Sequence, residues 1–376
     1  MSGKFTVKLE KALYGCIESA RLWYELISSK LRGLGYEENP YDICVFNKVV
    51  DGKQVTVALY VDDLLVTCEC EPTLDAALDE IQGLFGGATV HKGKVHSYLG
   101  MTFDFTQDGR VLVKMDGYVE DILKEYEVTG TAKSPAPADL FEIDEAAEAL
   151  NAAGVEDFHS RVATLLFLGK RARPDLLTAI SFLSTRVQMP TIQDWNKLNR
   201  SLRYLNSTKD LWLCLSSSSD YGIEAYIDAS FGVHPDGKGH TGVCITIGGG
   251  FFYVSSTKQK IVTKSSTEAE LVGVSDGVSQ VIWARNFLLA QGLEIGPAII
   301  WQDNKSTMAM VDKGRSTSSR TKHISIRYFF ITDRVRSGDV ILKYKPTEQI
   351  VADLLTKPIQ GELFRYLRRM MLNLNV

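Results

Sequence analysis

Four carboxylates in the second half of the sequence are candidates for one metal-dependent active site. Asp228 lies in an apolar run, Glu270 near the start of a long helical pattern, Asp303 directly after an apolar run, and Asp353 in a C-terminal helical pattern. They are far apart in the sequence, so only folding could bring them together. Carboxylates gathered at one edge of a sheet suit two Mg²⁺ ions about 3.5 to 4 Å apart, which hydrolyse phosphodiester bonds. The pattern predicts a two-metal site for Mg²⁺, with Mn²⁺ as a substitute.

Each of these acids also has an ordinary structural explanation. Asp228, Asp303 or Asp353 alone could be a helix cap or a solvated strand end. Glu268 competes with Glu270, because two residues that are two positions apart on a helix cannot share a face. We select Glu270, since the apolar positions that follow it would turn the same face toward a sheet.

A second candidate is the pair Asp62 and Asp63, within Tyr60-Val61-Asp62-Asp63 between two apolar runs. Adjacent carboxylates repel each other and lose hydration beside packed strands, and a divalent cation relieves both penalties. The alternative is a hairpin tip with two solvated acids, because aspartate favours turns.

Hydrophobic periodicity and turn residues indicate the elements that would position these acids. In the second half we expect strands over 223–231, 241–247, 251–256, 299–302 and 340–344, with helices over 267–290, 305–312 and from 348 onward. In the first half we expect helices over 13–36, 74–85 and 117–126, strands over 41–50, 54–68, 97–106 and 110–115, and helices within 158–208. Asp51-Gly52 predicts a hairpin, and Ser134-Pro135-Ala136-Pro137 predicts a linker.

Composition excludes several classes of protein. The 376 residues are 45% hydrophobic and 23% charged, which is typical of a folded chain rather than a disordered or low-complexity one. No run is long and apolar enough for a membrane helix, and no signal peptide is apparent, so we expect a cytoplasmic or nuclear protein without membrane contact. The scattered cysteines predict neither a zinc site nor a disulfide framework.

Charge is segregated along the chain, although the net charge is only −4. Most of the charged residues within 313–345 are basic, and residues 139–157 contain acidic but no basic residues. A local basic face can bind phosphates. Candidates for substrate binding are Lys258, Arg320, Lys322 and His323; the alternative is solvated lysines and a loop histidine without a role.

The order of motifs in the first half resembles a copia-type retrotransposon reverse transcriptase. The matching segments are Lys11-Ala12-Leu13-Tyr14-Gly15, Arg21-Leu22-Trp23-Tyr24, Tyr41-Asp42-Ile43-Cys44-Val45-Phe46, Tyr60-Val61-Asp62-Asp63, Tyr98-Leu99-Gly100-Met101, Arg173-Pro174-Asp175 and Leu202-Arg203-Tyr204-Leu205. The resemblance implies that Asp62 and Asp63 lie on a palm hairpin and bind Mg²⁺, with template and primer as partners.

Two departures from the family pattern lead us to expect no polymerase activity from this chain alone. The family has a third catalytic aspartate upstream of the Lys-Ala-Leu-Tyr-Gly motif, and this sequence has no aspartate before Asp42. We therefore expect the strand that carries it, and the fingers, to be absent. The family's Gln-Ala-Pro-Arg is replaced by Glu18-Ser19-Ala20-Arg21, and an acid there would repel phosphates.

The second half resembles a copia-type ribonuclease H domain. The matching segments are Ser265-Ser266-Thr267-Glu268-Ala269-Glu270, Asp303-Asn304, Arg320-Thr321-Lys322-His323-Ile324 and Ala352-Asp353-Leu354-Leu355-Thr356-Lys357-Pro358. The resemblance implies cleavage of RNA in RNA–DNA hybrids, with the four acids as metal ligands and no small-molecule cofactor beyond the metal.

We therefore predict a multidomain protein of the α/β and α+β classes. Its parts are a truncated reverse transcriptase palm and thumb (1–135), a linker and helical connector (136–220), a ribonuclease H-like mixed five-stranded sheet with helices (221–360) and a basic tail (361–376). The predicted activity is Mg²⁺-dependent endonucleolytic cleavage of RNA–DNA hybrids. The alternative is an inactive nucleic-acid-binding relic, or a piece active only within a larger Pol.

Overall fold

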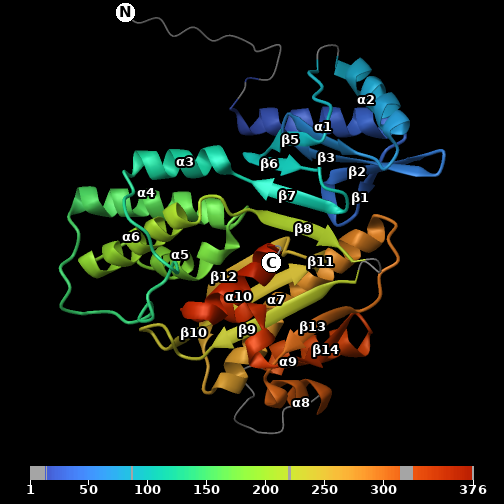
Figure 1. The fold of residues 1–376 in the computed structure, drawn as a ribbon. Coiled ribbons are helices and arrows are strands. Elements are labelled where there is room, and N and C mark those ends of the chain that lie inside the picture. The colour runs from blue at the N-terminus through green and yellow to red at the C-terminus, as the bar shows by residue number, and fades with distance from the viewer. Residues whose placement is uncertain (1–12, 14, 86–87, 219–221, 314–324, 375–376) are drawn as a thin grey trace, which may run out of the picture. The chain divides into compact units, whose positions relative to one another are not determined.

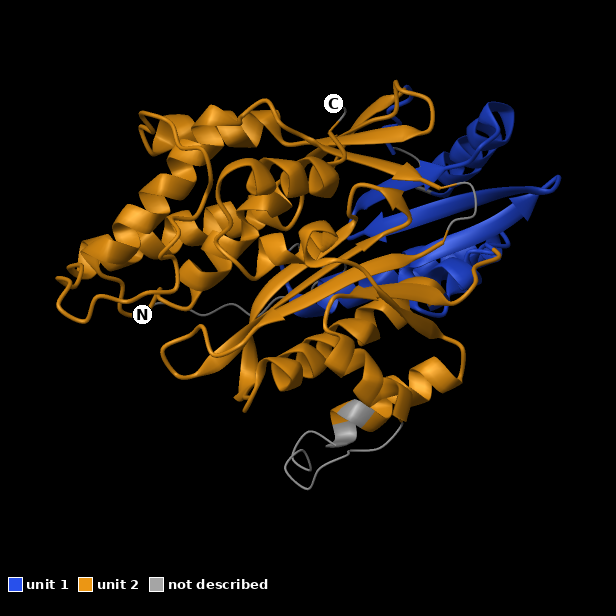
Figure 2. Cartoon of the chain, turned by 60° about the horizontal axis from the view of Figure 1, so that its bottom comes forward, with its two compact units in different colours: residues 1–93, 286–293 blue, residues 94–285, 294–376 orange. Residues whose placement is uncertain are grey.

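The computed structural model describes residues 13, 15–85, 88–218, 222–313 and 325–374. The chain forms two compact units (Figure 2): Met1–Gly93 with Asn286–Leu293, and Lys94–Arg285 with Glu294–Val376. Several sheets and many helices give a mixed α and β architecture (Figure 1), as predicted. The boundary between the units falls at residue 93, whereas the sequence predicted a boundary at 135.

The first unit is an antiparallel sheet with two helices. The strands run in the order β1 (Glu37–Asn39), β2 (Asp42–Val50), β3 (Lys53–Tyr60) and β4 (Asp63–Thr67), with helices α1 (Ile17–Gly33) and α2 (Glu71–Phe85). Every second residue of β3 is buried, at Val55, Val57 and Leu59, which is the alternation of a half-buried strand. These side chains pack with Ile27 and Ile81 of the two helices in one core.

A mixed five-stranded sheet occupies much of the second unit. Its order is β12 (Tyr253–Val262), β10 (Lys238–Thr246), β9 (Glu224–Ser230), β13 (Ala298–Gln302) and β14 (Val340–Tyr344). The first three strands are antiparallel, and β9, β13 and β14 are parallel. Helix α7 (Ser266–Ala290) connects β12 to β13. Helices α8 (Lys305–Lys313) and α9 (Ser325–Arg336) lie between β13 and β14 in the sequence.

An antiparallel sheet and a group of helices complete the second unit. The sheet order is β11 (Gly248–Gly249), β8 (Leu213–Ser217), β7 (Arg110–Lys114), β6 (Met101–Asp104) and β5 (Val95–Tyr98). The helices are α3 (Asp116–Glu125), α4 (Ala152–Gly169), the short 3₁₀ helix η1 (Pro174–Leu176), α5 (Leu177–Ser184), α6 (Ile192–Ser207) and α10 (Gly361–Leu372). Because β7 pairs with β8, this sheet joins residues on both sides of the predicted boundary at 135.

A buried ion pair holds the helical part together. Arg173 and Asp175, which flank Pro174, form a bidentate pair at 2.9 and 2.8 Å, and both side chains are almost completely buried. The hydroxyl of Tyr204 on α6 donates to Asp175 at 2.6 Å, and Arg173 donates to the backbone oxygen of Thr208. The pair therefore fastens the start of α5 to the end of α6.

Two expectations about local structure are wrong. Residues 54–68 form two strands, because the chain turns at Val61 and Asp62. The segment after residue 348 is not a continuous helix: Asp353 lies in the 3₁₀ helix η4 (Val351–Leu355), which follows η3 (Thr347–Gln349). Within the segment predicted as a basic tail, residues Gly361–Leu372 form the helix α10, which buries Phe364, Leu367, Met371 and Leu372.

The segment predicted as a linker packs against the helical part of the second unit. Ser134 and Ala136 are buried against α6, where Ser201 donates to the backbone oxygen of Pro135 at 3.0 Å. This segment is thus docked rather than free.

Among the described residues, no helix combines the length and apolar character that crossing a bilayer requires.

Candidate active site: a buried carboxylate cluster

The mixed sheet and the 3₁₀ helix η4 bring Asp228 and Asp353 together. Asp228 lies on the central strand β9 and pairs with Gly242 of β10. A Cβ atom on Gly242 would lie 2.7 Å from Cβ of Leu355 and 2.8 Å from the backbone oxygen of Ala352. Only a glycine therefore lets η4 approach the sheet closely enough to place Asp353 beside Asp228.

Helix α7 positions Glu270 by a similar close approach. At Gly277, a Cβ atom would lie 2.8 Å from Ile227 and 2.9 Å from Val243, so the helix lies directly on β9 and β10. Glu268 has a different role, since its carboxylate accepts a hydrogen bond from the backbone N–H of Lys264 at 2.8 Å, just before the helix. Ser265 caps the helix by accepting from the backbone N–H of Glu268 at 3.2 Å. Glu270, as selected from the sequence, is the glutamate that faces the aspartates.

Asp303 follows the last residue of β13, where neighbouring polar groups hold it. The side-chain oxygen of Gln302 accepts from the backbone N–H groups of Asp303 and Asn304, and Thr347 donates to Asp303 at 2.7 Å. The amide nitrogen of Gln302 donates to Glu270 at 3.3 Å. One buried glutamine thus links the two acids.

The structure gathers the predicted acids in the second unit. Asp228, Asp303 and Asp353 each offer a carboxylate oxygen, and these oxygens lie within 4.8 Å of one another. Among the described residues, this is the only group of three or more such ligands. Glu270 lies close enough to Asp228 and Asp303 for their charges to act on it.

Crowding of negative charge in a buried place makes the cluster retain protons. Burial, followed by repulsion from Asp228 and Asp303, raises the pKa of Glu270 from 4.5 to about 9. Burial and Asp228 raise the pKa of Asp353 from 3.8 to about 7. Lys357 partly neutralises the site, with Nζ 2.9 Å from Asp353 and 3.5 Å from Asp228. Burial opposes the charge of Lys357, but the two aspartates outweigh it and raise the pKa of the lysine.

The donor set fits a hard divalent cation. All four ligands offer oxygen atoms, which Mg²⁺ and Mn²⁺ prefer. Thr356 donates to Oδ2 of Asp228, whereas the buried Oδ1 has no hydrogen-bond partner in the described structure. Nζ of Lys357 lies 3.5 Å from this oxygen as an ion-pair partner, and a bound cation would also compensate its buried charge. Asp228, Glu270, Asp303 and Asp353 are therefore the residues that would hold a metal.

A chain of buried hydrogen bonds connects strand β10 and strand β12 with the last residue of η4. Ser256 donates to the backbone oxygen of Leu355 at 2.7 Å and interacts with Nε2 of His240 at 2.8 Å, while Nδ1 of His240 lies 2.9 Å from Nε2 of His234. Burial lowers the pKa of His240 to about 3 and that of His234 to about 4, so both rings are neutral. Because the serine hydrogen is donated to Leu355, each histidine must carry its proton on Nε2.

The other predicted substrate-binding residues have different outcomes. Lys258 on β12 forms an ion pair with Asp236 at 2.8 Å. Arg320, Lys322 and His323 lie outside the described residues. Sequence reasoning gave no role to Lys357, although its position four residues after Asp353 is the spacing of a helical ion pair.

Asp62 and Asp63 lie at an exposed hairpin turn of the first unit. Tyr60 pairs with Asp63 across the turn from β3 to β4, and Val61 has a φ of 52°. A β-branched residue is strained in this left-handed region. The indole of Trp23 donates to the backbone oxygen of Val61 at 2.5 Å and so fastens the turn to α1. The pair belongs to no group of three potential ligands among the described residues.

Comparison with known proteins finds relatives that are similar to nearly the whole chain. Residues 2–139 match the family model "Reverse transcriptase (RNA-dependent DNA polymerase)". The Retrovirus-related Pol polyproteins from transposons RE1 and RE2 of Arabidopsis thaliana are 30% and 28% identical over 96% and 97% of this chain. The one from transposon TNT 1-94 of Nicotiana tabacum is 27% identical over 95%.

These matches define a class of mobile-element polyproteins that carry a reverse transcriptase. The matches support a fragment of a copia-type retrotransposon Pol polyprotein. The chain spans about a quarter of the length of these relatives: 24% for RE1, 25% for RE2 and 27% for TNT 1-94. A solved ribonuclease H1 isolated from compost is 17% identical and covers 36% of this chain and 92% of its own, with a TM-score of 0.27, which is too low to support an argument.

Proposed function

We propose that this chain hydrolyses the RNA strand of RNA–DNA hybrids at the carboxylate cluster, as the ribonuclease H part of a copia-type Pol. The observation that carries the proposal is the convergence of Asp228, Asp303 and Asp353, from three separate elements, to within 4.8 Å. The mixed five-stranded sheet is the architecture expected for a ribonuclease H-like domain, and the motifs that resemble that family contain Glu270, Asp303 and Asp353. On this proposal, residues 1–135 are a truncated palm and thumb, and residues 136–220, with α4 to α6, are a linker and helical connector.

The residues of the cluster would divide the work. Two divalent ions, when bound, supply the activation of water and the stabilisation of the leaving oxygen. Asp228, Glu270, Asp303 and Asp353 would hold them, and Glu270 would do so as a carboxylate, although burial and its acidic neighbours raise its pKa to about 9. Lys357, which neutralises Asp228 and Asp353, would be free to turn toward a substrate phosphate once a cation takes its place.

The substrate would be recognised mainly through its backbone. A hybrid duplex is distinguished from a DNA duplex by the shape of its grooves. Contacts to the charged backbone and to this shape should therefore dominate recognition. Arg320, Lys322 and His323 remain candidate contacts. Lys258 would first have to leave Asp236.

We expect no DNA polymerisation by this chain alone. Asp62 and Asp63 offer two carboxylates, and two-metal phosphoryl transfer needs a fuller set. Extension of a primed template by the purified chain would overturn this expectation.

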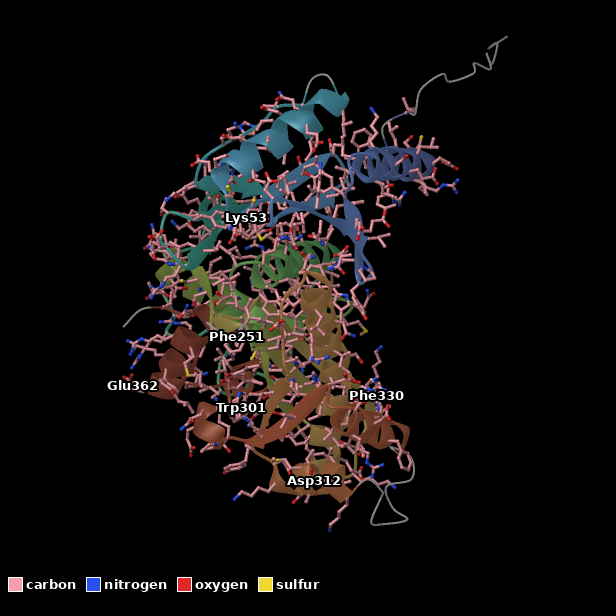
Figure 3. The ribbon with its side chains drawn as sticks, turned by 90° about the vertical axis from the view of Figure 1, so that its right-hand side faces the viewer. Lys53, Phe251, Trp301, Asp312, Phe330 and Glu362 are labelled. Carbon is pink, nitrogen blue, oxygen red and sulfur yellow. The ribbon has the colours of Figure 1, made fainter. Side chains whose placement is uncertain are left out.

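The test is cleavage of an end-labelled RNA–DNA hybrid in Mg²⁺ by the purified chain. Asp303→Asn should abolish cleavage because it removes a ligand at nearly constant shape. Asp312→Asn, at an exposed position of α8 labelled in Figure 3, is the matched control and should cleave normally. Undiminished cleavage by Asp303→Asn would refute the assignment. Binding without cleavage by folded wild-type protein would instead support a binding relic, or a piece that acts only within a larger Pol.

A further inference from the structure

A polar cleft of about 800 Å³ lies on the second unit, away from the residues assigned above. Residues 131–139, helix α6 and the start of α10 form its walls. Its charged lining residues are Lys133, Asp139, Lys197, Arg200 and Arg203. No aromatic side chain lines it, so it offers no platform on which a base could stack.

The cleft has an excess of positive charge that the protein does not neutralise. Lys197 is buried and donates to the backbone oxygens of Leu140 and Glu142 at 2.9 and 2.5 Å, so it serves the fold. Lys133, Arg200 and Arg203 form no ion pair among the described residues. Three cations beside the single carboxylate of Asp139 favour an anionic ligand.

One of these cations is held in place before any ligand arrives. Arg200 donates through Nη2 to Ser134 at 3.0 Å and to Gln360 at 3.4 Å, and Gln360 in turn donates to the backbone oxygen of Ala136 at 2.8 Å. Nε of Arg200 is buried and has no hydrogen-bond partner in the described part of the chain. The hydrogen bonds of Nη2 fix the orientation of the guanidinium group, which lines the cleft, and guanidinium groups pair well with phosphate oxygens.

The cleft lies a short distance along the backbone from the carboxylate cluster. Gln360, which lines it, is three residues after Lys357, so their Cα atoms are at most about 11 Å apart. Phosphates along one strand of a duplex are spaced by about 3.4 Å of axial rise. A strand with one phosphate at Lys357 could therefore reach the cleft within a few nucleotides.

We infer that this cleft binds the phosphodiester backbone of the nucleic acid whose scissile bond lies at the carboxylate cluster. The identity of the ligand rests on the proposed function, whereas the need for an anion rests on the cleft alone. Because the contacts are to phosphates, the cleft contributes affinity without sequence preference.

The experiment measures binding of a fluorescent RNA–DNA hybrid by anisotropy in EDTA, where no metal-dependent cleavage occurs. Lys133 and Arg203 are exposed, so the double variant Lys133→Ala/Arg203→Ala should fold normally. Each lost phosphate contact should weaken binding roughly eightfold at 0.1 M salt and reduce the slope of log K against log salt by about 0.9. Lys124→Ala, an exposed lysine of α3 outside the cleft, is the matched control.

Affinity and salt slope equal to those of Lys124→Ala would overturn the inference. A selective loss for one labelled hybrid sequence but not another would also overturn it, because backbone contacts do not read bases. If wild-type protein binds the hybrid through the cleft but never cleaves it in Mg²⁺, the proposed function fails while the cleft assignment stands. If the double variant cleaves and binds the hybrid as the wild-type protein does, the cleft assignment fails while the proposed function stands.

Discussion

Raising the pH from 7 to 8.5 should destabilise the metal-free protein through Glu270. Burial and repulsion from Asp228 and Asp303 raise the pKa of this carboxyl from 4.5 to about 9, so the folded protein keeps a proton that the unfolded chain has lost. A difference of one bound proton lowers the free energy of unfolding by about 1.4 kcal/mol per pH unit. The expected loss over this interval is about 2 kcal/mol.

The sign and the interval follow from the direction of each shift. A raised pKa favours the folded state fully below the unfolded value, and that contribution is lost as the pH rises toward 9. His234 and His240 act in the opposite sense, because their lowered pKa values favour the folded state as the pH rises to about 6.5. Above pH 7 they are neutral in both states. Asp353, with a pKa of about 7, adds to the effect of Glu270 at the lower end.

The assay is urea unfolding in EDTA at several pH values between 7 and 8.5, with wild-type protein and Glu270→Gln. The amide cannot ionise, so the variant should be the more stable protein at pH 8.5 and should show a much flatter dependence on pH. Equal slopes for the two proteins, or a wild-type stability that rises with pH, would show that Glu270 does not keep its proton in the folded protein.

Other substitutions test the supports of the site. Gly242→Ala should destabilise the fold by about 1 to 3 kcal/mol in urea unfolding, because the new methyl group would overlap Leu355; a neutral effect would contradict the close approach of η4. Asp175→Ala should cost about 3 to 5 kcal/mol by leaving Arg173 buried without its partner, and a loss below 1 kcal/mol would show that the pair is dispensable. His240→Phe should lower the melting temperature without shifting the pH optimum of cleavage, since the ring supports η4 without exchanging protons.

Most of the sheet elements could be predicted because their signals are local. The alternation of Val55, Val57 and Leu59 defines β3 by itself. Periodicity ran one strand through the turn after Tyr60, which only the alternative of a hairpin tip and the family resemblance placed there, since Val61 is an unfavourable residue for a left-handed turn and is held by a contact with Trp23. The amphipathic pattern of α10, with buried Phe364 and Leu367 three residues apart, was present but was hidden by its basic residues.

The acids of the site could be selected from the sequence, but their arrangement could not. Its place in an apolar run pointed to Asp228, and motif resemblance pointed to Asp303 and Asp353, whereas the placement of Asp353 in a 3₁₀ helix depends on a glycine in a distant strand. The contact of Lys357 with two carboxylates likewise exists only after η4 docks on the sheet. Such long-range packing leaves no mark in local periodicity.

These four carboxylates should form a Mg²⁺ site, and calorimetry of Mg²⁺ binding measures this without relying on cleavage. Titrations at pH 7.5 in two buffers of different ionisation enthalpy report both the affinity and the protons released. We predict saturable binding with net proton release, because the cation displaces the proton of Glu270, and loss of that binding in Asp228→Asn. Absence of binding by the folded wild-type protein, or binding that is unchanged in the variant, would contradict the account.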